Sequence, residues 1–211
     1  MSRWRVRENG HIRRKTKNKV MAHIDRLIPH IIKWETGVRQ LYGESLEHLF
    51  ERARRPGYAC DPDDKGGATQ SGVTIGTFKA YRKAQGKPVP TVNDLRNISY
   101  AEWRNVLKTF FWDKVNADAF RSEDVACMVV DWYWTSGRWA VVNTQKVLSV
   151  AADGVFGAKS LAALNGYKRG QYELWKAIRD ARKAFYTRIA KGAQGKFLKG
   201  WLNRVNDLKW T

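Results

Sequence analysis

Apolar residues recur at helical spacing through most of the chain, which is typical of helices that bury one face. Ile24, Leu27, Ile28 and Ile31 begin the series. Pro29 is expected either to kink this first helix or to mark where a second segment starts. No segment shows the sustained alternation of polar and apolar residues that a half-buried strand requires. The pattern therefore predicts a mainly α fold.

Capping residues and glycines mark where several of these helices begin and end. Thr74 can cap the segment TIGTFKAYRKAQG, and Ser99 and Glu102 have capping-box spacing. Gly37 is a suitable stop for the first helix. We expect further helices in ESLEHLFERARRPG, over 122–136, at about 139–149, 158–165 and 171–191, and in FLKGWLNRVNDLKW. The 122–136 helix has an apolar body and is expected at the centre of the fold.

The chain of 211 residues is long enough for one large domain, or for two small ones that share a core. We divide it into a basic N-terminal arm at 1–20, a main region at 21–149 and a C-terminal helical region at 150–211. No flexible linker separates the last two regions, so the C-terminal helices are expected to dock on the same core. The segment YACDPDDKGGATQSGVT is expected to hold at most a short hairpin.

The excess of basic residues constrains the partners of this protein. There are 39 Lys and Arg against 20 Asp and Glu, which gives a net charge of +19. This implies an anionic partner, either nucleic acid, a membrane surface or a polyanionic cell wall. No apolar stretch approaches the length of a membrane span, and the basic N-terminus lacks the apolar core of a secretory signal. We therefore expect a protein made in the cytoplasm that acts elsewhere only after release.

The pattern of potential ligands favours neither a metal nor a cofactor. Cys60 and Cys127 are interpreted as two reduced thiols, because no metal-binding spacing of Cys or His occurs. The loop DPDDKGGAT resembles a calcium loop, but the twelfth residue from Asp61 is Gly72 and not the required Glu. No Gly-Lys-Ser/Thr run follows its glycine pair. An Asp/Gly turn is the simpler interpretation of this loop.

Two carboxylates are candidates for acid–base chemistry. Glu35 follows Ile31, Ile32 and Trp34. It is either a solvated charge at the end of a helix or an acid kept partly dry, because an apolar environment disfavours the ionised form of a carboxyl group. Glycoside cleavage needs one such proton donor and a second group on the other side of the bond. Asp64, in the glycine-rich loop, suits the second role.

The order of the segments WETG, GYACDPDDKGGATQSGVT, FWD, DWYWTSG, DGVFG and GWLNRV resembles the glycoside hydrolase 108 family of N-acetylmuramidases. That family includes phage-type endolysins and proteins described as secretion activators. The match covers about residues 25–210. The resemblance implies a lysozyme-like, mainly α fold over 21–149 and a peptidoglycan-binding region at 150–211. One departure is clear: the Glu-Gly-Gly-Tyr run of the family is split here by a helical insertion after Gly37.

The resemblance also implies roles for particular residues. Glu35 matches the catalytic Glu of the family, Asp64 and Thr69 match its glycine loop, and Thr74 matches its Gly-Ile-Thr segment. Trp112 lies in FWD, which matches a Tyr-Trp-Asp run.

Two further positions complete the expected substrate-binding set. Asp131 matches the acid of the Asp…Asn-Ser-Gly helix, and Tyr58 is a candidate for sugar stacking, as is Trp112. Trp112 is equally compatible with a structural role. The segment ADGVFGAKSLAALNG resembles the turn of peptidoglycan-binding modules, but Asp153 and its glycines are interpreted as a structural turn.

The implied function is hydrolysis of the β-1,4 bond between N-acetylmuramic acid and N-acetylglucosamine by a monomeric enzyme without cofactor. Glu35 would be the general acid, and Asp64 or Thr69 would position a water molecule or the substrate. A non-catalytic cell-wall-binding protein is the alternative if the split motif misplaces Glu35. A basic nucleic-acid-binding protein is a third possibility, supported by charge alone.

Overall fold

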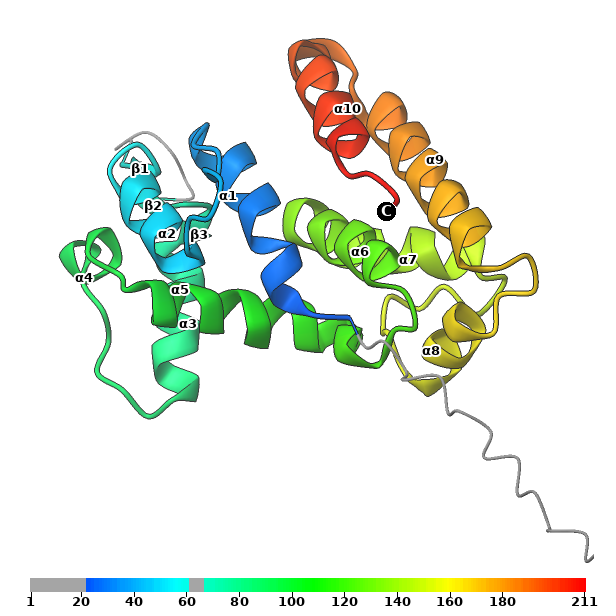
Figure 1. The fold of residues 1–211 in the computed structure, drawn as a ribbon, viewed down its shortest axis with the longest axis horizontal. Helices are drawn as coiled ribbons and strands as arrows, with labels where there is room; N and C mark the ends of the chain where they lie inside the picture. The colour runs from blue at the N-terminus through cyan, green and yellow to red at the C-terminus, as the bar shows by residue number, and fades with distance from the viewer. Residues whose placement is uncertain (1–21, 61–66) are drawn as a thin grey trace, which may run out of the picture.

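The computed structural model describes residues 22–60 and 67–211, which fold into helices with one small sheet. Figure 1 shows two halves, with α1 and the end of the α5 segment between them. The first half contains α2 (Leu46–Arg54), the sheet, α3 (Ile75–Ala84), α4 (Val92–Arg96) and α5 (Tyr100–Leu107). The second contains α6 (Glu123–Ser136), α7 (Arg138–Val147), α8 (Ala158–Asn165), α9 (Gln171–Ile189) and α10 (Leu198–Asp207). The predicted mainly α, lysozyme-like class is confirmed.

The helix α1 (Ile28–Thr36) brings Glu35 to the boundary between the halves. A 3-10 turn, η1 (Ile24–Arg26), precedes α1, and Pro29 lies in the first turn of α1, where its missing N–H costs no hydrogen bond. Pro29 therefore marks the start of a second segment, as one of the two alternatives predicted. Gly37 ends α1 with φ 76°, a conformation that glycine adopts without strain.

The sheet has three two-residue strands in the order β1 (Tyr58–Ala59), β2 (Thr69–Gln70) and β3 (Val73–Thr74). Both pairings are antiparallel, and Gln70 pairs with Val73 across a two-residue turn. Ser71 and Gly72 form this turn with φ 46° and 82°, as a type I′ hairpin requires. The sequence predicted at most a short hairpin, so β1 is an addition to it.

The helix α6 is the centre of the second half. Its residues 124–132 are all buried, and α7 and α9 both pack against it. The helix α10 in turn packs on α9, and Figure 1 shows it above the gap between α1 and α6. The C-terminal helices therefore share one core with α6, as the sequence predicted.

The connecting turns complete the path of the chain. A π-helical turn, η2 (Lys108–Trp112), extends α5, and two 3-10 turns follow it, η3 (Asp113–Val115) and η4 (Ala117–Ala119). A third, η5 (Gly192–Phe197), links α9 to α10. The helix α9 ends at Ile189, shortly before the predicted end at residue 191.

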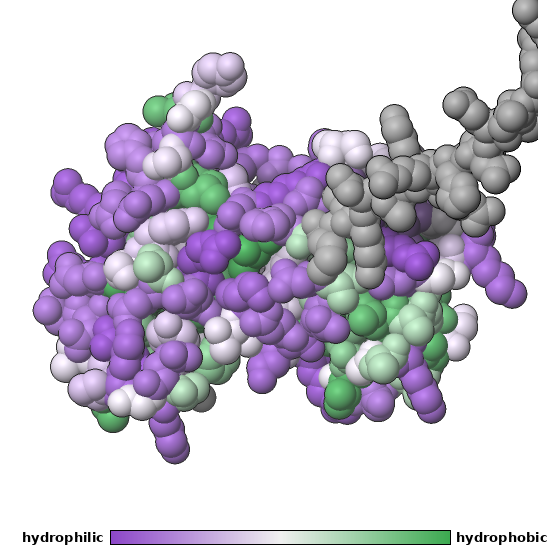
Figure 2. Space-filling model, turned by 60° about the horizontal axis from the view of Figure 1, so that its bottom comes forward, coloured by the Kyte–Doolittle hydropathy of each residue, from purple (hydrophilic) through white to green (hydrophobic). Residues whose placement is uncertain are grey.

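The surface is mostly hydrophilic on the face drawn in Figure 2, with one hydrophobic area in the right-hand half. None of the helices among the described residues is both long and apolar enough to cross a membrane. Cys60 is exposed and Cys127 is buried, and both are free thiols. Burial raises the pKa of the Cys127 thiol to about 12, so it stays protonated at neutral pH.

Candidate active site

Glu35 lies at the edge of an open pocket of about 520 Å³ between α1, α6 and the C-terminal helices. Its side chain is 21% exposed, so the carboxyl group is neither fully solvated nor buried. The pocket is rich in aromatic side chains, which all come from the helices α6, α7, α9 and α10 of the second half, and Trp139 is the most exposed of them. The lining residues are Glu35, Gly72, Trp134, Thr135, Ser136, Trp139, Phe185, Tyr186, Ile189, Trp201 and Arg204.

Two donors hold the same oxygen of Glu35. Trp134 Nε1 donates to Oε1 at 2.8 Å from α6, and Arg204 Nη1 donates to Oε1 at 2.7 Å from α10. Among the described residues no donor reaches Oε2. The position of the carboxyl group is therefore fixed through one oxygen, while the second remains available. The guanidinium group of Arg204 is a charged neighbour that neither sequence-based alternative for Glu35 predicted.

Gly72 allows the hairpin to approach Glu35 closely. A Cβ atom at this position would lie 2.8 Å from Glu35 Cδ and 2.6 Å from Trp134 Cζ2, closer than real contacts allow. The backbone of the turn is held on its other side, because Trp103 Nε1 donates to Ser71 O at 3.1 Å. The short sheet thus forms one wall of the pocket, and only glycine fits at its tip.

Asp131 lies behind Arg204 and fixes its orientation. Arg204 Nη2 donates to Asp131 Oδ1 at 2.7 Å, and Arg182 Nη2 donates to Oδ2 at 2.7 Å. Burial opposes ionisation of Asp131, but the two guanidinium groups outweigh it and hold its pKa well below the usual range. Burial also opposes the charge of Arg204, and the charges of Asp131 and Glu35 more than offset this and raise the Arg204 pKa.

The network continues from Asp131 to the other face of α1. His30 Nε2 lies 3.4 Å from Asp131 Oδ2, and His30 Nδ1 lies 3.5 Å from Asp207 Oδ2. Asp207 also accepts hydrogen bonds from Lys33 Nζ at 2.6 Å and Trp34 Nε1 at 2.8 Å. Residues on both faces of α1, the helix that carries Glu35, therefore form hydrogen bonds or ion pairs with α10.

The other predicted site residues within the described part of the chain do not line this pocket. Tyr58 lies in β1 beside a separate cavity of about 220 Å³, with the Arg96 guanidinium 5.3 Å from its ring centre. Thr69 pairs within the sheet, and the Thr74 hydroxyl caps α3 by accepting from Thr77 N at 3.1 Å. Asp64 lies outside the described residues.

Two of the predicted substrate contacts need correction. Trp112 is fully buried and donates through Nε1 to Asp118 Oδ1 at 2.6 Å, so its ring offers no face to a sugar. Asp131 is also fully buried, and its oxygens are occupied by the two arginines. Trp112 is therefore a core residue, and Asp131 acts on the pocket only through Arg204.

Sequence reasoning gave no role to Arg204, Trp134, Trp139 or Trp201. Arg204 and Trp201 are part of the quoted segment GWLNRV, and Trp134 is part of DWYWTSG, so these motifs contained the signal. Their roles depend on contacts across 99 residues for Trp134 and 169 for Arg204, which local spacing does not encode. Within 22–60 and 67–211 no group of three or more His, Cys, Asp or Glu side chains could hold a metal ion.

Comparisons with known families match almost the whole described chain in two adjacent parts. The sequence model described as "Glycosyl hydrolase 108" matches residues 28–137. The model described as "Predicted Peptidoglycan domain" matches residues 139–206. The two matches meet at the sharp turn between α6 and α7. Glu35 and Trp134 lie in the first match, whereas Arg204 lies in the second.

Among solved structures, the chain is similar to SagA of Brucella abortus, with 28% sequence identity and a TM-score of 0.63. The similarity covers 87% of this chain and 89% of that chain. A comparison with curated proteins gives no significant match. The structural likeness extends over both matched regions, so the docked arrangement of the C-terminal helices belongs to the shared fold.

Proposed function

Because the chain belongs to the glycosyl hydrolase 108 family, we propose that it cleaves the β-1,4 bond between N-acetylmuramic acid and N-acetylglucosamine with Glu35 as general acid. Family membership makes the protein a glycoside hydrolase of peptidoglycan, and the C-terminal match agrees with a cell-wall substrate. To this activity the proposal adds which glycosidic bond is cleaved and that Glu35 donates the proton. The observation that carries it is the partly exposed carboxyl group of Glu35, held through Oε1 at an aromatic pocket.

The geometry of Glu35 suits proton donation. Glu35 pairs with Arg204 when it is ionised; in its protonated form Oε1 still accepts from Trp134 and Arg204, and Oε2 carries the proton that is donated to the glycosidic oxygen. The leaving sugar then departs with that proton as its hydroxyl hydrogen. The rings of Trp139 and Trp201 flank the same space and can contact the apolar faces of sugar rings.

A second group is needed on the other side of the bond. We keep Asp64 in this role, with Thr69 as the residue that positions a water molecule or the substrate. Thr69 lies in β2, two residues before the turn whose Gly72 lines the pocket. A carboxylate there would activate water or attack the anomeric carbon.

Hydrolysis of purified peptidoglycan by wild type and Glu35→Gln tests the acid. The amide keeps the size of the side chain but has no acidic proton, so we expect the rate to fall by at least about 100-fold. Glu47→Gln, an exposed substitution on α2, should leave the rate unchanged. Mass spectrometry of wild-type products should show N-acetylmuramic acid at the new reducing ends. Full activity of Glu35→Gln would remove Glu35 from the mechanism.

Further features belong to the same proposal. The division at about residue 150 separates cleavage from wall binding, and the basic segment 1–20, predicted as an arm, lies outside the described residues. The enzyme works as a monomer. It reaches the wall after release from the cytoplasm, where its excess positive charge favours association with the anionic polymer.

A further inference from the structure

A second aromatic pocket lies on the C-terminal region, away from Glu35. It has a volume of about 490 Å³ and lies between the first half of α9 and the tail that follows α10. Tyr172 and Trp175 come from α9, and Trp210 comes from the tail. None of its lining residues also lines the Glu35 pocket. It is therefore a separate candidate site.

The three rings form a corner that suits a flat, partly apolar ligand. Tyr172 and Trp175 are nearly parallel, at 11° with centroids 6.4 Å apart, and Trp210 is turned by 68° and 64° from them. Tyr172 is 48% exposed. The Trp175 Nε1 donor is buried, and no acceptor among the described residues satisfies it, which is uncommon for an indole. A sugar ring offers C–H faces that can pack against such aromatic rings.

Cations surround these rings. Lys176 Nζ lies 4.7 Å from the Tyr172 ring centre, and Arg179 Cζ lies 5.0 Å from that of Trp175. Lys209 also lines the pocket. Lys176 and Arg179 are paired with Glu173 and Asp180, so Lys209 is the lining cation here that has no carboxylate partner among the described residues. This lysine favours a sugar whose substituent carries a carboxylate over a neutral sugar.

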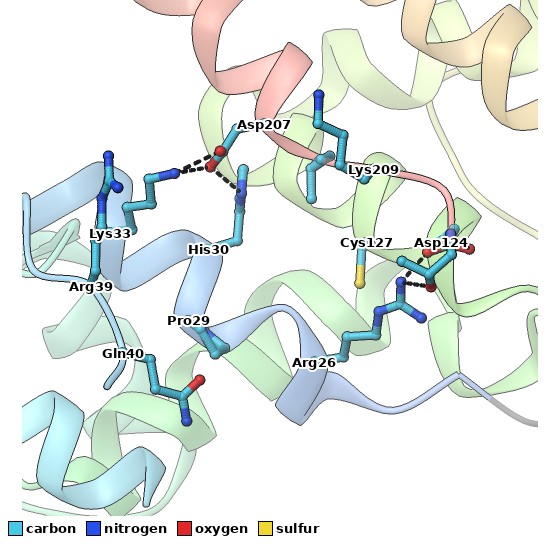
Figure 3. Close-up of a pocket in the computed structure, with 12 residues that line it drawn as sticks. Arg26, Pro29, His30, Lys33, Arg39, Gln40, Asp124, Cys127, Asp207 and Lys209 are labelled. Atoms are coloured by element: carbon cyan, nitrogen blue, oxygen red, sulfur yellow. Dashed lines mark hydrogen bonds and ion pairs between the residues drawn. The ribbon is translucent and has the colours of Figure 1, made fainter. Parts of the chain in front are cut away.

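Lys209 also lines a neighbouring pocket of about 350 Å³, which Figure 3 shows between α1 and the tail. Lys33 and Arg39 line it from α1 and the segment that follows, opposite Lys209. Lys33 is paired with Asp207, and Arg26 is paired with Asp124. Within the described part of the chain, neither Arg39 nor Lys209 has a carboxylate partner.

The charges of this second pocket favour an anion. Four cations line it, namely Arg26, Lys33, Arg39 and Lys209, against the two carboxylates of Asp124 and Asp207. The aromatic corner and the cationic pocket share Lys209 as a lining residue, and we refer to the two together as the joined pockets. A ligand that spans both needs a sugar at one end and several carboxylates at the other.

We propose that these joined pockets bind the N-acetylmuramyl peptide unit of peptidoglycan. The sugar lies in the corner of Tyr172, Trp175 and Trp210. The carboxylates of its stem peptide extend past Lys209 toward Arg39 and Lys33. This inference depends on the proposed function only for the identity of the polymer. It places a wall-binding site on α9 and the tail, partly within the region matched by the peptidoglycan model.

Binding of a soluble disaccharide tetrapeptide to the full-length protein, measured by calorimetry, tests the proposal. This ligand ends in N-acetylmuramic acid and lacks the bond that the enzyme is proposed to cleave. Tyr172→Ala should weaken its binding about tenfold, as expected for the loss of one stacked ring. Lys209→Ala should weaken it about threefold, with a smaller effect at high salt. Lys209→Ala should leave binding of neutral N,N′-diacetylchitobiose unchanged.

Matched controls separate this site from general effects of mutation. Tyr42→Ala removes a fully exposed tyrosine, and Lys159→Ala removes an exposed lysine of α8, both outside the joined pockets. Both control variants should bind like wild type. If Tyr172→Ala and Lys209→Ala also bind like wild type, the proposal is wrong.

A measurement on the unmutated protein avoids any dependence on folding of the variants. The indole N–H resonances of Trp175 and Trp210 should shift when the disaccharide tetrapeptide is added. Shifts confined to Trp134, Trp139 and Trp201 would place the ligand at Glu35 only and overturn the proposal. Failure of the Glu35→Gln test would leave this result intact, so the two proposals can fail separately.

Discussion

Gly72 shows how closely the carboxyl group of Glu35 is enclosed. The type I′ turn gives this residue φ 82°, and the missing side chain leaves room for Glu35 and Trp134. Position 72 therefore has two separate requirements. Its backbone needs a positive φ, and the space next to Glu35 and Trp134 leaves no room for a side chain. The requirement on backbone conformation is common to many turns, whereas the requirement on space arises from the candidate active site.

Gly72→Ala should separate these requirements when it is compared with Gly43→Ala. Gly43 has φ 72° and nothing within 4 Å of the place that a Cβ atom would take, so its substitution should cost only about 1 kcal/mol of unfolding free energy. Gly72→Ala also forces Glu35 and Trp134 to move, and we expect a loss of about 2–4 kcal/mol and at least a tenfold lower rate. Urea denaturation and peptidoglycan hydrolysis measure the two effects. Equal losses in both variants would contradict this account of Gly72.

At the scale of single residues, the sequence predicted that Glu35 lies near the end of the first helix. It did not predict which residues contact the carboxyl group. The apolar neighbours Ile31, Ile32 and Trp34 suggested a dry acid, but Ile31 and Ile32 face the core and Trp34 donates to Asp207. The groups that contact Glu35 are Trp134 and Arg204. Both come from distant segments, and the pattern around a residue does not show what packs against it.

Arg204 makes the last helix a part of the active site. Its guanidinium group contacts both Glu35 and Asp131. Arg204→Gln should lower kcat at least tenfold with little change in KM for a short oligosaccharide, because Glu35 loses its fixed position. Loss of the buried pair should also cost about 3–5 kcal/mol of unfolding free energy. Lys199→Gln removes an exposed charge from the same helix and should change neither quantity, and equal behaviour of the two variants would contradict this role.

The segment between Gly37 and α2 is stabilised by Glu44. Its carboxylate accepts from Arg52 Nε at 2.6 Å and from Leu41 N at 2.9 Å, and these bonds lower its pKa to about 2. The stabilisation is present above the unfolded pKa of about 4.5 and is lost as the pH falls toward 2. Thermal unfolding should show Glu44→Gln less stable than wild type at pH 6, with the difference shrinking below about pH 4.5. A constant difference across this range would contradict this assignment.

Local sequence signals predicted where individual helices begin, but they did not predict every helix. Pro29 and Thr74 mark the starts of α1 and α3, because proline geometry and hydroxyl capping act within a few residues. The helix α4 was missed, although Thr91 and Asp94 form a capping box at its start. Its five residues bury only Leu95, too little apolar periodicity to be recognised.

The net charge of +19 acts at the scale of the whole molecule. Attraction between this surface and an anionic wall is screened by salt, with a Debye length of about 10 Å at 0.1 M. Clearing of a cell-wall suspension should therefore slow as salt rises from about 0.05 to about 0.5 M. Hydrolysis of a short, soluble oligosaccharide of N-acetylmuramic acid and N-acetylglucosamine, which carries few charges, should change much less over the same range. Equal salt dependence of both reactions would contradict a role for long-range attraction.

The overall architecture was predictable, whereas the assignment of tryptophans to core or pocket was not. Helical periodicity predicted the mainly α fold class, and the apolar 122–136 segment predicted which helix lies at the centre of the fold. Trp112 and Trp139 look alike as sequence, but one is fully buried and the other 60% exposed. Only the packing of α7 against α6 and α9 decides which ring faces the pocket.

The contact between Glu35 and Arg204 also limits how such enzymes can be rebuilt from parts. The acid belongs to the region matched by the hydrolase model and its arginine to the region matched by the peptidoglycan model. A chimera that replaces the C-terminal half with an unrelated targeting module would lack Arg204. The carboxyl group of Glu35 would then lose the hydrogen bond from this arginine. The two halves must therefore be inherited, transplanted or redesigned together.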